Sequence, residues 1–165
     1  MNMKIEFVET SPLWKRALPY RKLAKIAIDA ALAESGVTLK RGVEMSVHLI
    51  DDDKIRVLNA QWRKKDEPTD VLSFPAVNSA KVGETRLLGD VLISYETMER
   101  DAKEEGRPLG DHFSHLVVHG FLHLLGHDHI VDLEAEEMEK LEIRILAKLG
   151  VANPYAHGDL ADAAA

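Results

Sequence analysis

Residues 110–126 read GDHFSHLVVHGFLHLLG and end at a glycine. Most positions between the histidines are apolar: Phe113, Leu116, Val117, Val118, Phe121, Leu122, Leu124 and Leu125. A helix that is hydrophobic nearly all round is buried inside a protein. The stretch therefore predicts a buried helix over about 110–125, ended by Gly126.

Four histidines form a polar seam along this helix. At 100° per residue they fall within a sector of roughly 80°; they are His112, His115, His119 and His123. Burying imidazoles without partners costs about 2 kcal/mol or more each. A bound metal ion would remove that cost and fix the rings, so the seam indicates a metal site.

Three histidines have the spacing of metal ligands. His119 and His123 lie one helical turn apart on the same face, and a turn at Gly126 can bring His129 to the same ion. The chain has no cysteine, so its metal ligands must be nitrogen or oxygen atoms. Three histidines leave a fourth position for water, which is the arrangement of catalytic zinc. We expect one Zn²⁺ per chain on these histidines; core histidines satisfied by hydrogen bonds are the alternative.

The same spacing occurs in the metzincin proteases, H-E-x-x-H-x-x-G-x-x-H. Where these proteases carry the glutamate that serves as general base, this chain has Gly120. A glycine has no side chain to accept a proton, so peptidase activity does not follow from the metal site. A carboxylate introduced at position 120 would be expected to reach the metal.

The order of predicted elements favours an α/β or α+β fold, a single domain with a small mixed sheet of about four strands packed with about five helices. The predicted strands are 3–9, 43–49, 71–74 and 88–94, and the predicted helices are about 19–34, 52–60, 95–105, 110–125 and 133–149. The last helix is expected to bury Leu133, Met138, Leu141, Ile145 and Leu149. We expect one domain over 1–155 and a disordered tail over 156–165.

The formal net charge of −7 argues against a protein that coats nucleic acid, because neutralising many phosphates requires clustered cations. An enzyme that binds only a few phosphates locally remains compatible with this net charge. Arg63, Lys64 and Lys65 are a candidate local patch, or simply a solvated helix end. No stretch is long and apolar enough for a membrane span, and the start lacks a secretory pattern, so we expect a cytoplasmic protein without a membrane partner.

Four blocks of the sequence together resemble one family. They are HGFLHLLGHDH at 119–129, LNAQWRKKDEPTDVLSFP at 58–75, LGDVLIS at 88–94, and EAEEM at 134–138 followed by NPY at 153–155. These blocks resemble the YbeY family of bacterial rRNA maturation factors, which are described as metal-dependent endoribonucleases. The family pattern usually has tyrosine where this chain has His127, which adds a possible fourth nitrogen near the metal.

The resemblance implies zinc on His119, His123 and His129, a need for Arg63 in activity, and a basic groove for single-stranded RNA. It implies processing of rRNA at the 3′ end of the small-subunit RNA, ribosome quality control, and the small ribosomal subunit as partner; no DNA substrate is expected. Asp128 is interpreted either as the general base or as a residue that orients a ligand histidine.

Two other functions remain open from the sequence. One is a metallohydrolase of another substrate, such as a peptide. The other is a ribosome-assembly factor that binds RNA or protein and uses zinc structurally.

Overall fold

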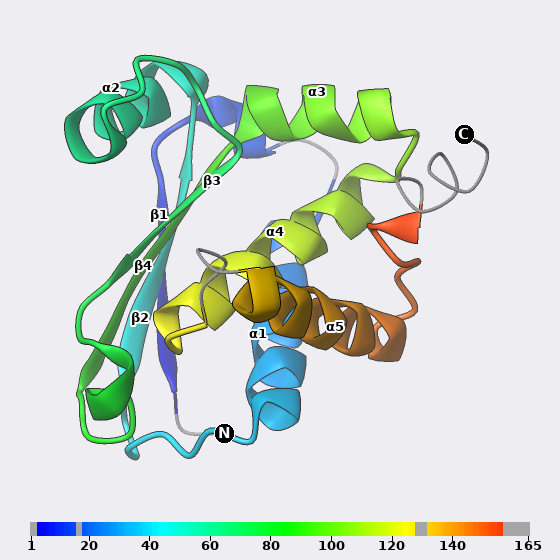
Figure 1. Cartoon of the computed structure of the whole chain (residues 1–165). Helices are drawn as coiled ribbons and strands as arrows, with labels where there is room; N and C mark the ends of the chain where they lie inside the picture. Colours follow the sequence, from blue (N-terminus) through cyan, green and yellow to red (C-terminus); the bar gives the residue numbers. More distant parts are fainter. Residues whose placement is uncertain (1–2, 16–17, 128–131, 157–165) are drawn as a thin grey trace.

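The computed structural model describes residues 3–15, 18–127 and 132–156. It contains a four-stranded sheet and five α-helices, which confirms the predicted fold class (Figure 1). The strands are β1 (Lys4–Glu9), β2 (Glu44–Ile50), β3 (Val71–Pro75) and β4 (Leu87–Ser94). The helices are α1 (Tyr20–Ser35), α2 (Asp52–Arg63), α3 (Tyr95–Glu105), α4 (Leu109–Leu124) and α5 (Asp132–Lys148). Except for Ala156, the predicted tail lies outside the described residues, and none of the helices described is long and apolar enough to cross a membrane.

The sheet has the strand order β1-β2-β4-β3. Strands β1, β2 and β4 run parallel, and β3 pairs antiparallel with β4 at the edge. Because side chains alternate between the two faces of a strand, Met45, Val47 and Leu49 of β2 share one face. These residues belong to the main hydrophobic core, together with side chains of α1, α4 and α5. In Figure 1 these three helices lie on one side of the sheet and α2 lies on the other.

The opposite face of the sheet carries a second, smaller apolar cluster. Its buried members are Ile50, Ile55, Leu72 and Leu92. Only α2 contributes a helix residue to this buried set, so this face has much less apolar cover than the face against α1 and α4.

Helix α2 begins and ends on local signals. The Asp51 side chain accepts a hydrogen bond from the Lys54 N–H at 2.9 Å, as is typical of an N-cap aspartate. The helix continues to Arg63 rather than ending near residue 60. Lys64 then adopts a left-handed conformation with φ 58°, and its N–H bonds to the carbonyl of Asn59. This ending leaves Arg63 as the last helical residue beside the edge strand β3.

The predicted stripe of α5 is correct in its middle, whereas its last member, Leu149, lies past the helix end at Lys148 and is half-buried. Met138, Leu141 and Ile145 are buried, whereas Leu133 is 68% exposed. The buried stripe begins at Met138, so the first turn of α5 extends past the core. A charged residue, Glu142, is fully buried within the same stripe.

Candidate metal and RNA site

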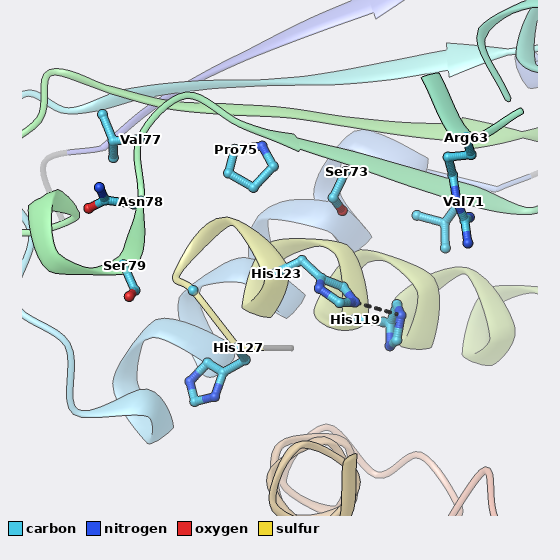
Figure 2. A pocket seen from close by; sticks show the side chains of 11 residues that line it. Arg63, Val71, Ser73, Pro75, Val77, Asn78, Ser79, His119, His123 and His127 are labelled. Atoms are coloured by element: carbon cyan, nitrogen blue, oxygen red, sulfur yellow. Dashed lines mark hydrogen bonds between the residues drawn. The ribbon is translucent and has the colours of Figure 1, made fainter. Parts of the chain in front are cut away.

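His119 and His123 face each other from successive turns of α4. Their Nε2 atoms are 3.2 Å apart and their ring centroids 4.7 Å apart (Figure 2). Two nitrogens bound to one tetrahedral zinc ion, each at about 2.0–2.1 Å, lie about 3.3–3.4 Å apart. The pair therefore fits two ligand positions of one zinc ion. The third predicted ligand, His129, and the neighbouring Asp128 lie outside the described residues.

Glu142 of α5 holds the His119 ring in place. Its Oε1 atom lies 2.5 Å from His119 Nδ1, and the Tyr155 hydroxyl donates to its Oε2 at 2.5 Å. Burial raises the pKa of Glu142, but the hydrogen bonds from His119 and Tyr155 outweigh it and leave that pKa below its ordinary value. Because a carboxylate faces Nδ1, that nitrogen carries the proton, and Nε2 presents its lone pair toward His123.

Sequence reasoning missed Glu142 and Tyr155. The available signal was the position of Glu142 in α5: it stands one and four residues after two buried apolar positions, Leu141 and Met138. A carboxylate on the apolar stripe of a helix is rarely buried without a partner. Nothing in the sequence named His119 as that partner, since α4 and α5 meet only in the folded chain.

The other two histidines of the seam, His112 and His115, extend this buried network toward Arg107, and His115 Nε2 lies 3.4 Å from the Tyr155 hydroxyl and 3.8 Å from Glu142 Oε1. Arg107 Nη1 lies 3.3 Å from His112 Nδ1 and 3.4 Å from His115 Nδ1. Burial lowers the pKa of His115 to about 4 and also lowers the pKa of His112. Both rings are therefore neutral at pH 7 and accept from the guanidinium. His115 therefore links Arg107 to the Glu142–Tyr155 pair behind His119, while His119 and His123 line the pocket described next.

A pocket of about 500 Å³ lies between the edge strand and α4 (Figure 2). Its lining comprises Arg63, Val71, Ser73, Pro75, Val77, Asn78, Ser79, His119, His123, Gly126 and His127. The pocket thus brings Arg63 of α2 together with the histidine pair of α4.

Arg63 is exposed at the end of α2. Within the described part of the chain, Arg56 pairs with Asp66 and Arg100 pairs with Asp52, but Arg63 makes no salt bridge. A guanidinium without a carboxylate partner, directed into a polar pocket, suits an anionic ligand such as a phosphate.

His127 also lines the pocket, beyond the turn that follows α4. Its N–H donates to the carbonyl of Leu122 at 3.0 Å, and burial lowers the pKa of its ring. Figure 2 shows this ring apart from the facing rings of His119 and His123. The structure therefore gives His127 a place in the wall of the pocket.

Gly120 is oriented differently from the sequence-based expectation. A Cβ atom at this position would lie 2.7 Å from Val91 Cγ1 and 3.1 Å from Ser73 Oγ. Ser73 Oγ also donates to the Gly120 carbonyl at 3.0 Å. The expectation that a carboxylate at position 120 would reach the metal is wrong, because this position faces the sheet. Glycine is required here for the close approach of α4 to β3 and β4.

A second group of possible ligands lies outside the pocket. Donor atoms of Asp70, Asp101 and His112 are all within 4.8 Å of one another. Burial and the neighbouring Asp70 raise the pKa of Asp101 to about 6. Among the residues that the structure describes, this is the group in which three His or carboxylate donor atoms lie this close to one another.

Known proteins are similar to this chain over most of its length. The family model described as Endoribonuclease YbeY matches residues 11–150. A protein named Endoribonuclease YbeY from Rhodopseudomonas palustris (strain BisA53) is 48% identical over 160 residues, covering 95% of this chain and 92% of the relative. Another of that name, from Chelativorans sp. (strain BNC1), is 46% identical and covers 92% and 93% of the two chains.

A solved structure also matches over most of its length. The solution structure of TM1509 from Thermotoga maritima aligns with a TM-score of 0.55 and 25% identity, over 88% of this chain and 91% of that one. These matches define the class of the protein, a nuclease and therefore a hydrolase. The chain belongs to the Endoribonuclease YbeY family.

Proposed function

We propose that this chain is a zinc-dependent endoribonuclease that cleaves single-stranded RNA during maturation of the small-subunit rRNA. The observation that carries the proposal is the pocket in which Arg63 lies with the facing nitrogens of His119 and His123. The relatives are named Endoribonuclease YbeY, which supports RNA as the substrate. In this proposal the enzyme acts in the cytoplasm, on rRNA at the small ribosomal subunit, and serves ribosome quality control.

Zinc would be held by His119, His123 and His129, one ion per chain. When bound there, it would supply a Lewis acid for phosphodiester hydrolysis. Glu142 keeps the proton of His119 on Nδ1, so that Nε2 remains a ligand atom. Tyr155 donates to the other oxygen of Glu142 and holds the carboxylate in place.

Arg63 would bind the substrate phosphate. Its planar guanidinium can donate two parallel hydrogen bonds to phosphate oxygens, and the charge would offset the negative charge that develops during cleavage. The pocket volume of about 500 Å³ leaves room for a phosphodiester between Arg63 and the histidines. Asp128 remains a candidate for the general base or for orientation of a ligand.

The peptidase alternative loses support from the position of Gly120. Metzincins place their general base directly after the first ligand, but here that position packs against Val91 and Ser73. The assembly-factor alternative, with a structural zinc, predicts binding of RNA without cleavage.

A cleavage assay with matched variants tests the proposal. The zinc-loaded protein should cut a labelled single-stranded fragment that spans the 3′ end of the small-subunit rRNA. Arg63→Ala should reduce cleavage by at least about a hundredfold while zinc content and melting temperature stay unchanged, since Arg63 is exposed and supports no core. Arg56→Ala, on the same helix and paired with Asp66, is the control and should cut like the parent. RNA binding without cleavage by the parent would instead favour the assembly factor.

A further inference from the structure

A second groove lies on the opposite face of the sheet, under α2. Its volume is about 600 Å³. The lining consists of His48, Ile50, Lys54, Leu58, Trp62, Phe74, Pro75, Asp90 and Leu92. Most of these side chains are apolar or aromatic, and nothing in the proposed hydrolysis uses them.

Trp62 is the prominent side chain of this groove. It is 64% exposed, and its ring contacts Phe74 edge to face, with centroids 5.9 Å apart. Lys54, Leu58 and Trp62 are spaced four residues apart on α2, so they line one side of the groove together. A large aromatic ring held at the surface beside apolar residues is typical of a binding surface.

The groove adjoins the candidate active site at the edge of the sheet. Pro75 of the edge strand β3 lines both cavities. Trp62 lines the groove, and the next residue, Arg63, lines the pocket. A strand of nucleic acid with a phosphate at Arg63 would therefore have a neighbouring nucleotide at Trp62.

The charges in the groove favour a base over a second phosphate. Asp90 lines it, and its carboxylate accepts a hydrogen bond from Ser46. A carboxylate repels phosphate but can accept a hydrogen bond from the amino group of a base. Lys54 offers a cation on the α2 side, where it can meet the sugar–phosphate backbone.

We propose that this groove is a nucleobase subsite, in which an unpaired base adjacent to the bound phosphate stacks on Trp62. The inference rests on the proposed single-strand endoribonuclease function and specifies how its substrate is recognised. Bases can reach Trp62 only when they are unstacked, so duplex RNA is excluded from this subsite.

The chain provides its own fluorescent reporter. It has two tryptophans, of which Trp14 is 2% exposed in the core and Trp62 is 64% exposed. Quenching of tryptophan fluorescence on rapid mixing with a short single-stranded RNA, read before cleavage, therefore reports on Trp62. The parent should be quenched by the single strand and not by a duplex of the same sequence.

Substitutions separate stacking from other roles. Trp62→Ala should weaken binding of the single strand about tenfold or more, because stacking of a base on an aromatic ring contributes about 1–3 kcal/mol. Trp62→Phe should retain most of the affinity. Val57→Ser, which alters another exposed apolar residue of α2 outside the groove, should bind like the parent. Circular dichroism of each variant verifies its fold.

A single-stranded RNA with one abasic nucleotide at the stacked position should bind the parent as weakly as Trp62→Ala binds the intact strand. The affinity of the abasic RNA for Trp62→Ala should be no lower than its affinity for the parent. Parental affinity in Trp62→Ala, or binding without a fluorescence change, would overturn the subsite and leave the groove to a protein partner. Failure of the proposed endoribonuclease function would give a different result: the parent protein would cut no RNA, and the Trp62 variants would not change that.

Discussion

Single residues decide how the proposed metal ligands are oriented, and Glu142, which faces His119 Nδ1, is the clearest case. Glu142→Gln preserves the shape of the side chain but removes the charge that faces His119 Nδ1. We expect zinc affinity to fall about tenfold to a hundredfold, as is typical when the outer partner of a ligand histidine is lost. Competition with a chelator measures the change. Glu139→Gln, at an exposed position of the same helix, is the control; equal losses in both variants would remove the assigned role of Glu142.

Substitution of the proposed ligand histidines should lower the zinc content of the protein. His119→Ala and His123→Ala should each reduce bound zinc well below one ion per chain, because each variant removes one of the facing nitrogens. His129→Ala should do the same if the predicted third ligand is correct. His48→Ala, on the other face of the sheet, should retain full zinc. Metal analysis of the purified variants measures the bound zinc. One zinc per chain in all three ligand variants would contradict the proposed site.

The close packing of helix α4 on the sheet can be tested at Gly120. Gly120→Ala introduces a Cβ atom 2.7 Å from Val91 Cγ1, so the free energy of unfolding should fall by about 1–3 kcal/mol. Gly110→Ala, on the same helix, is the matched control, because its Cβ atom would lie no closer than 3.7 Å to any neighbouring atom. That control should be neutral or slightly stabilising. Urea unfolding compares the two, and equal stabilities would mean that α4 does not pack this closely on the sheet.

Element boundaries were predicted best where a local signal sets them. Gly36 and Gly106 end α1 and α3 in the left-handed conformation that glycine favours, and Asp51 caps α2. Predictions that depended on distant neighbours failed. Leu133 fits the apolar period of α5 but lies beyond the core. Ser94 stands at the N-cap position of α3 but its side chain makes no cap hydrogen bond, because its hydroxyl donates to Asp52 of α2 at 2.6 Å.

At the scale of the whole molecule, the candidate site depends on topology that no local pattern contains. His119 and His123 could be paired from helical spacing alone, and the family resemblance pointed to Arg63. Their convergence requires β3 to return antiparallel at the edge of the sheet, where α2 and α4 meet it from opposite faces. Spacing in the sequence cannot give that arrangement, nor the neighbouring groove that shares Pro75 with the pocket.

Charge burial at Asp101 predicts how the stability of the whole fold changes with pH. Burial and Asp70 raise the pKa of Asp101 from 3.8 to about 6. Between these values the folded chain holds a proton that the unfolded chain has lost, so the contribution of this group to stability falls as pH rises through the range. Asp101→Asn cannot ionise. It should raise the melting temperature more at pH 7.5 than at pH 4.5, measured by calorimetry; an equal effect at both values would contradict the assigned pKa.

We propose that RNA cleavage depends on one metal ion in the pocket of Arg63, His119 and His123. Titration of metal-free protein with zinc, while cleavage of a single-stranded rRNA fragment is followed, tests it most directly. We expect no cleavage without metal, a linear rise to one zinc per chain, and a plateau beyond it. Full cleavage by the metal-free protein, or a rate that does not follow zinc occupancy up to one equivalent, would contradict this metal dependence.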